Sequence, residues 1–162
     1  MKKQIFSIWV ENQLGVLSKV AAFFGETGLN IDSLAVGTTE NSSASRITIV
    51  TEGTEEALTA VIAKMNESTN LIKVKRITDD SSVLRELALI MVEAPEARRQ
   101  DIMTIAEIFR AQVVDVGIRT MTLEMSGGQD KIQAMEDLLK PFGIREIVRT
   151  GVIAIERGTR VE

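Results

Sequence analysis

Residues 5–30 read IFSIWVENQLGVLSKVAAFFGETGLN, and this stretch decides the fold. Its first six residues are rich in β-branched and aromatic side chains and precede a polar segment, which predicts a strand. Apolar residues then recur at helical spacing, which predicts a helix over 15–27. Gly28 is the residue best able to end that helix, and a second strand begins at Asn30. The chain therefore opens as β-α-β.

The same order of elements occurs twice along the chain. After the polar loop 38–43, an alternating strand, a helix that begins near Gly53 and a further strand complete a βαββαβ unit. We expect the strands of the second unit at residues 84–92, 113–116, 120–125 and 144–148, with 152–155 extending its sheet. We expect its helices at 97–111 and after Gly127-Gly128, the latter stopped by Pro141 and Gly143. The pattern predicts an α+β protein of two tandem ferredoxin-like domains, each an antiparallel sheet with both helices on one face.

One short polar segment separates the two units. We expect a first domain at 1–78, a linker at 79–83 and a second domain at 84–162. The sheet faces opposite the helices also carry apolar side chains, and domains this small bury little core alone. We therefore expect sheet-to-sheet or edge-to-edge pairing with another copy, which makes the protein a dimer.

The composition excludes several classes of function. The chain has 162 residues, 19 Lys+Arg against 23 Asp+Glu, and no Cys, His or Tyr. Metal sites built from His and Cys, thiol nucleophiles, Ser-His-Asp triads and histidine bases are thereby excluded. A carboxylate-only metal site or a lysine-based mechanism stays possible. The net charge of -4 argues against a nucleic-acid binder, which needs clustered basic residues.

No targeting or membrane segment is visible in the sequence. The apolar run after Lys2-Lys3 is interrupted at Glu11, too early for a signal peptide. No apolar run approaches the roughly 20 residues needed to span a bilayer. We expect no membrane association and a cytoplasmic protein.

The two halves differ at the first strand-to-helix loop. In the first half this loop is Asn12-Gln13-Leu14-Gly15-Val16-Leu17, whereas its counterpart at 93–97 has no glycine. Asn30 in the first half likewise corresponds to Val113 in the second. The fold thus forms without this glycine and asparagine, so their presence in the first half needs another reason.

Two interpretations of these residues stay open. In the functional one, free backbone amides at a helix N-terminus beside Gly15 bind a carboxylate, and Asn30 supplies both a donor and an acceptor. An amino acid is then a natural ligand. In the structural one, Asn12 and Gly15 form a turn and a cap, and Asn30 only begins a strand.

Other polar groups offer weaker candidates. The Gly127-Gly128 stretch lacks the spacing of a phosphate loop and predicts a strand-to-helix turn. Arg98-Arg99 predicts a solvated helix start, with phosphate binding as the minor alternative. Asp79-Asp80 and Glu55-Glu56 could hold a hard cation, but we identify no third ligand.

The first half resembles the ACT domain, a regulatory amino-acid-binding module, and the whole chain resembles the small regulatory subunits of acetolactate (acetohydroxyacid) synthase. The segments that carry the resemblance are 11–17, 30–34, 45–49, 85–90, 107–111, 114–116 and 142–151. The resemblance runs from about residue 2 to about residue 158 and favours the ligand-site interpretation.

This resemblance implies a non-catalytic subunit without a cofactor of its own. In the family, thiamine diphosphate, Mg²⁺ and FAD belong to the catalytic large subunit, which the small subunit activates and makes sensitive to feedback inhibition by valine or another branched-chain amino acid. The effector lies between the ACT domains of a homodimer. The resemblance implies these effector-binding positions: Asn12, Leu14, Gly15, Val16 and Leu17 in the loop of one chain, and Asn30 and Ile31 in the other.

We expect the effector to stabilise one arrangement of the dimer. This change of arrangement would reach the second domain through a hinge at Asp79-Asp80-Ser81. The alternative is a stand-alone amino-acid-binding ACT regulator of another enzyme. A stand-alone enzyme and an RNA-binding ferredoxin-like sheet are the other classes, and the few aromatic residues disfavour the latter.

Overall fold

The structure is a computed structural model that describes residues 2–78 and 81–158. The chain forms two compact units. The first contains the chain up to Val83 together with the C-terminal segment from Val152, and the second is Leu84–Gly151. Each unit has the predicted βαββαβ order, so the predicted fold class is confirmed.

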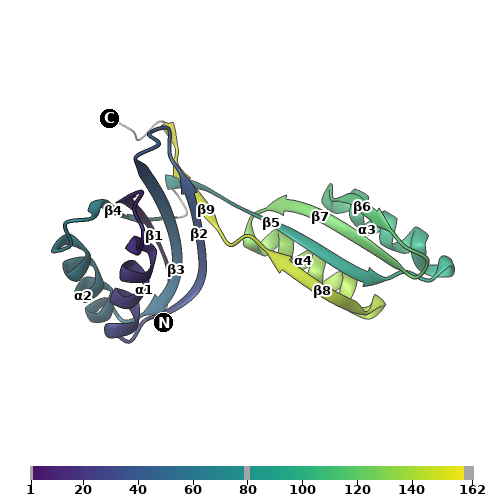
Figure 1. The fold of residues 1–162 in the computed structure, drawn as a ribbon. Coiled ribbons are helices and arrows are strands. Elements are labelled where there is room, and N and C mark those ends of the chain that lie inside the picture. The colour runs from purple at the N-terminus through teal and green to yellow at the C-terminus, as the bar shows by residue number, and fades with distance from the viewer. Residues whose placement is uncertain (1, 79–80, 159–162) are drawn as a thin grey trace. The chain divides into compact units, whose positions relative to one another are not determined.

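The first unit is an antiparallel sheet with two helices on one face (Figure 1). Its strands follow the order β2-β3-β1-β4 across the sheet. Its elements are β1 (Lys2–Glu11), α1 (Val16–Glu26), β2 (Asn30–Thr38), β3 (Ala44–Gly53), α2 (Glu55–Asn66) and β4 (Leu71–Ile77).

Along the two central strands, β1 and β3, successive side chains point to opposite faces of the sheet. Phe6, Ile8 and Val10 of β1 point toward the helices and join one apolar core with residues of β3, α1 and α2. Phe6 and Phe24 meet edge to face at 6.0 Å between ring centroids. This core fastens α1, and with it the loop that precedes α1, onto the sheet.

The opposite face of the first sheet is covered by the chain's own C-terminal segment. Residues on this face, such as Ser7, Thr48 and Val50, are 0–3% exposed although the helices lie on the other side. Strand β9 (Ile153–Glu156) pairs with β5 (Ser82–Glu93), and Val152 and Ala154 are buried. We expected residues 152–162 in the second domain and this face against another copy. The described residues 152–158 group with the first unit. Strand β9 nevertheless extends the second sheet by pairing with β5, as expected for 152–155.

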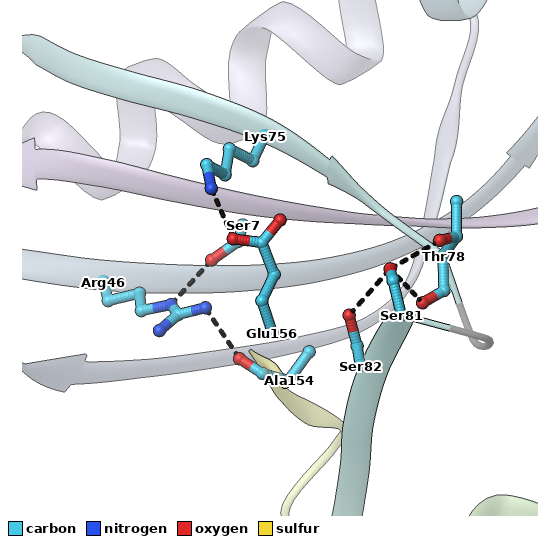
Figure 2. Close-up of polar contacts among 8 residues, drawn as sticks. All are labelled: Ser7, Arg46, Lys75, Thr78, Ser81, Ser82, Ala154 and Glu156. Atoms are coloured by element: carbon cyan, nitrogen blue, oxygen red, sulfur yellow. Dashed lines mark hydrogen bonds and ion pairs between the residues drawn. The ribbon is translucent and has the colours of Figure 1, made fainter. Parts of the chain in front are cut away.

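Polar contacts fasten this segment to the first sheet (Figure 2). The Arg46 guanidinium donates to Ser7 Oγ at 2.6 Å and to the Ala154 carbonyl at 2.7 Å, and it lies 4.5 Å from the Trp9 ring. Lys75 forms an ion pair with Glu156. Burial lowers the pKa of Arg46, which the negative charge of Glu156 opposes. We call residues 152–158 the C-terminal strap.

The expected linker at 79–83 is only partly a linker. Ser82 and Val83 already belong to β5, and Ser82 is buried. A hydrogen bond of 2.7 Å joins the side-chain hydroxyl groups of Thr78 and Ser81 (Figure 2). Asp79 and Asp80, the acidic part of the expected hinge and of one cation candidate, lie outside the described residues.

The second unit repeats the arrangement with sheet order β6-β7-β5-β8. Its elements after β5 are the 3₁₀ helix η2 (Glu96–Arg98), α3 (Arg99–Phe109), β6 (Gln112–Val116), β7 (Thr120–Gly127), α4 (Gln129–Leu139), the 3₁₀ helix η3 (Lys140–Phe142) and β8 (Ile144–Arg149). Ala88, Ile90 and Val92 of β5 face the helices and form the centre of its core. Helix α3 is shorter than the expected 97–111, because its first turn is 3₁₀ and Arg110 leaves the helix in a left-handed conformation, φ 56°.

Candidate functional site

The candidate site begins at the loop between β1 and α1. Asn12 holds this loop against the β2–β3 connection: its amide donates to the Ser43 carbonyl at 2.8 Å, and its Nδ2 donates to the Ser42 carbonyl at 3.2 Å. The asparagine therefore has the structural role that one interpretation gave it. It also fixes the path of the residues that follow.

Gly15 sets the geometry of the helix entrance. Its φ of 83° is a left-handed conformation that other residues rarely adopt, and a Cβ at this position has no atom of the chain within 4 Å. No side chain caps α1. The space in front of the helix N-terminus is therefore open on the side of Gly15.

The amides at this entrance have few acceptors. The Val16 amide reaches the Gln13 carbonyl only at 3.5 Å. Within residues 2–78 and 81–158, the amides of Gly15, Leu17 and Ser18 have no acceptor. Unsatisfied first-turn amides and the positive end of the helix dipole suit an anion.

The apolar residues of the loop have different positions. Leu14 is fully exposed and Leu17 is 44% exposed, so both are free to contact a ligand or a neighbouring chain. The Val16 side chain is buried in the core of the first unit. Of the predicted loop residues, Val16 therefore has only its backbone at the helix entrance, because its side chain is part of the core.

Asn30 and Ile31 begin strand β2. The Asn30 side chain is exposed, and its Nδ2 donates to Asp32 Oδ1 at 3.0 Å, which leaves the Asn30 Oδ1 available as an acceptor. The Asn30 carbonyl accepts from Thr51 Oγ1 at 2.5 Å. Ile31 is half-buried against the core, so its side chain is mainly structural.

A single chain does not bring the loop and Asn30 together. They lie at opposite ends of α1, whose eleven residues span about 16 Å. The sheet register agrees: Glu11 pairs with Ala44 at one end of the sheet, and Asn30 pairs with Glu52 near the other. The predicted residues therefore form two separate groups on each chain.

The corresponding loop of the second unit is closed by its own side chains. The Arg99 guanidinium donates to the carbonyls of Ala94, Gly117 and Ile118 at 3.1, 2.7 and 2.6 Å. Arg98 lies over the Phe142 ring at 4.1 Å. The expected solvated helix start holds for Arg98, which is exposed, whereas Arg99 is half-buried and turned onto three carbonyl groups. Of these two equivalent loops, only the one in the first unit leaves its helix entrance open.

The remaining candidates have structural roles. Gly128 precedes α4 as the expected turn, with Asp130 in the first helical turn. Glu55 forms two hydrogen bonds with Arg76, at 2.9 and 2.7 Å, which lower the pKa of the Glu55 carboxyl. Within the described part of the chain, no group of three or more acidic side chains is placed to hold a metal ion.

Sequence reasoning missed a polar network beside the loop. Asn70 Nδ2 donates to Glu11 Oε2 at 3.1 Å, and Lys19 Nζ donates to Asn70 Oδ1 at 3.2 Å. Since Asn70 is 59 residues from Glu11, no local pattern signals this contact. Through Asn70, the network links the end of β1 to the first turns of α1 and so stabilises the loop between them.

Comparisons with known proteins agree over the whole chain. Residues 6–73 match the family model for the ACT domain of acetohydroxyacid synthase small subunits, and residues 85–158 match the model for the small subunit of acetolactate synthase. A probable acetolactate synthase small subunit from Archaeoglobus fulgidus is 45% identical over 98% of this chain and 99% of its own length. An acetolactate synthase small subunit from Mycobacterium bovis is 42% identical over 98% and 95%.

A solved structure is similar along nearly the whole chain. The crystal structure of the acetolactate synthase small subunit from Thermotoga maritima has a TM-score of 0.89 at 32% identity, covering 97% of this chain and 98% of that one.

In the part of this chain that the structure describes, no helix is long and apolar enough to cross a membrane.

Proposed function

This chain belongs to the family of acetolactate synthase small subunits, and we propose that it activates the catalytic large subunit and makes it sensitive to feedback inhibition. The proposed inhibitor is a branched-chain amino acid, with valine as the first candidate. In this proposal the chain has no catalytic residues and binds no cofactor; thiamine diphosphate, Mg²⁺ and FAD belong to the large subunit. The ligand site lies between two first units, in a homodimer formed through that domain.

Edge strand β2 offers the geometry for such a dimer. It lies at one edge of the first sheet, and most of its residues are exposed or half-exposed. The β1–α1 loop lies at the end of the sheet where Thr38 pairs with Ser45, whereas Asn30 lies at the other end. Antiparallel pairing of β2 with its two-fold copy therefore brings Asn30 of one chain toward the loop of the other.

The two half-sites complement an amino acid. The amides of Gly15, Leu17 and Ser18 suit the carboxylate. The Asn30 Oδ1, with Asp32 beside it, suits the ammonium group. Exposed Leu14 and Leu17 offer an apolar contact to an aliphatic side chain. The single observation that carries the proposal is the open helix entrance at Gly15, which the second unit closes with Arg99.

Ligand binding across the interface would couple the site to the assembly. A ligand that contacts two chains binds only the dimer arrangement that brings both half-sites together, so it stabilises that arrangement by its differential affinity. The segment around Ser81 then carries this change toward the second unit. Asp79 and Asp80, which the hinge hypothesis includes, lie outside the described residues.

Calorimetry and enzyme assays test the site. In Gly15→Asp a carboxylate stands in front of the free amides, so we expect valine affinity to fall at least about tenfold. The matched control is Gly15→Asn, which has the same shape without the charge and tolerates φ near 83° similarly well. We expect Gly15→Asn to bind more tightly than Gly15→Asp. Equal, wild-type affinity in both folded variants would remove the site assignment.

The regulatory role has its own test. The chain is titrated into purified large subunit, with and without valine, leucine or isoleucine, and acetolactate formation is measured. We expect activation by the chain and inhibition by at least one effector. A large subunit whose rate does not change on addition of the chain favours the alternative, a stand-alone amino-acid-binding regulator of another enzyme.

A further inference from the structure

The second sheet has a face that the described chain leaves open. It is opposite helices α3 and α4, and register places two rows of side chains across it. One row is Asp115, Thr122, Met91 and Glu146, and the other is Gln112, Glu124, Leu89 and Val148. We call these eight residues the open face of the second unit. None of its apolar members belongs to the core beneath the helices.

The first unit shows what a covered face looks like. There the strap buries the corresponding residues, so that Ser7 and Thr48 are 0% and 3% exposed. On the open face, Leu89 and Met91 are only half-buried and Val148 is 53% exposed. The strap segment belongs to the first unit, so it does not provide the same cover within the second.

The charges of the open face indicate which kind of partner surface it can bind. Asp115, Glu124 and Glu146 have no ion-pair partner among residues 2–78 and 81–158. Alternation puts one basic residue, Arg85, on the same side at the beginning of β5, where it donates to the Leu84 carbonyl. Leu89 and Met91 thus form an apolar strip along β5, with Glu146 on the edge strand β8 and with Glu124 and Asp115 on β7 and β6 on the other side. Two-fold pairing of this face with itself brings like charges together, which disfavours a second copy.

We propose that the open face of the second unit is the docking surface for the large subunit, through a region that presents lysine or arginine side chains around an apolar patch. The inference rests on the proposed function, which supplies the partner. Half-buried Leu89 and Met91 give the apolar centre of the interface, and the three carboxylates set its orientation and its rate of association.

Charge reversal tests the acidic residues beside this apolar strip. The double variant Glu124→Lys/Glu146→Lys is compared with Glu96→Lys/Glu107→Lys, which has the same net charge but changes exposed residues on the helical side of the unit. Affinity for purified large subunit is measured by interferometry over a range of salt concentrations. We expect the face variant to bind about tenfold more weakly or worse, and with less sensitivity to salt. We expect the control to stay within about twofold of wild type.

A second variant separates docking from folding. Leu89→Thr/Met91→Thr keeps strand-forming residues but removes the apolar centre, and we expect a similar loss of affinity with unchanged circular dichroism. Valine binding to all the variants should match wild type, because the valine site belongs to the first unit. Face variants that bind the large subunit as tightly as wild type would overturn this inference alone.

Two further outcomes are decisive. A wild-type chain that does not bind the large subunit at all would overturn the proposed function and this inference with it. Charge reversal on the open face that changes self-association of the chain alone, measured by sedimentation velocity, would assign the face to a second copy and overturn the inference.

Discussion

Arg46 on strand β3 donates from Nη2 to the carbonyl oxygen of Ala154, 108 residues later, at 2.7 Å. The same guanidinium donates to Ser7 Oγ in the centre of the sheet. Through this contact the end of the chain becomes part of the first unit, although the whole second unit lies between the two residues in sequence.

Removal of the strap should weaken the first unit. A chain that ends at Gly151 exposes Val50, Thr48 and Ser7, which the strap covers. We expect hydrogen exchange in β1 and β3 to accelerate and the chain to self-associate. A chain that ends at Gly158 is the control, since it keeps every described contact of the strap. Identical exchange in the two truncated chains would show that the strap does not stabilise the sheet.

Arg46→Met should destabilise the protein by about 2 kcal/mol, because two hydrogen bonds of a charged donor are lost and the Ala154 carbonyl loses its partner. Urea unfolding measures the change. Arg85→Met is the control, since Arg85 is exposed and donates only to the adjacent Leu84 carbonyl. A loss no larger than that of the control would contradict the assigned role of Arg46.

The strap should loosen in acid. The hydrogen bond with Lys75 lowers the pKa of Glu156, so the folded state holds the carboxylate better than the unfolded chain does. The resulting stability is fully present above the unfolded value of about 4.3 and is lost as the pH falls through the lower folded pKa. In Glu156→Gln this part of the acid dependence should vanish. Urea midpoints from pH 6 down to about pH 3 test it, and curves of equal slope for variant and wild type would contradict it.

Arg110→Gly should stabilise the second unit by about 1 kcal/mol. Arg110 ends α3 at φ 56°, where a side chain is strained and glycine is not. The end of α1 already has glycine in this role, at Gly28 with φ 72°. Gly28→Ala is therefore the opposite control and should destabilise by a similar amount. Thermal melts of both variants measure the difference, and a lower melting temperature for Arg110→Gly would refute the strain argument.

Much of the fold was predictable because local patterns dictate it. The β-branched and aromatic residues of Ile5–Val10 and the helical spacing that follows Gly15 lead to the observed β1 and α1. The strap was not predictable, since residues 152–155 form an ordinary strand pattern that does not specify which sheet it covers. Their assignment to the first unit depends on Arg46 and Lys75, more than 80 positions away.

The candidate site was predictable in part. Comparison of the two halves pointed to Gly15, and in the structure that residue has a left-handed conformation and open surroundings. The same comparison did not reveal that Arg99 closes the equivalent loop, because its acceptors Gly117 and Ile118 come from a distant turn. Nor did it reveal that the Val16 side chain belongs to the core.

The central claim is that one ligand site combines the Gly15 loop of one chain with Asn30 of another. Gly15→Asp and Asn30→Val chains are therefore prepared separately, then mixed in equal amounts after mild unfolding and refolding, and valine binding is measured by calorimetry. Each variant alone should bind valine at least about tenfold more weakly than wild type. Random mixing leaves one intact site in each mixed dimer, so about one quarter of all sites should bind valine with wild-type affinity. A mixture as inactive as its two components would contradict a site shared between chains.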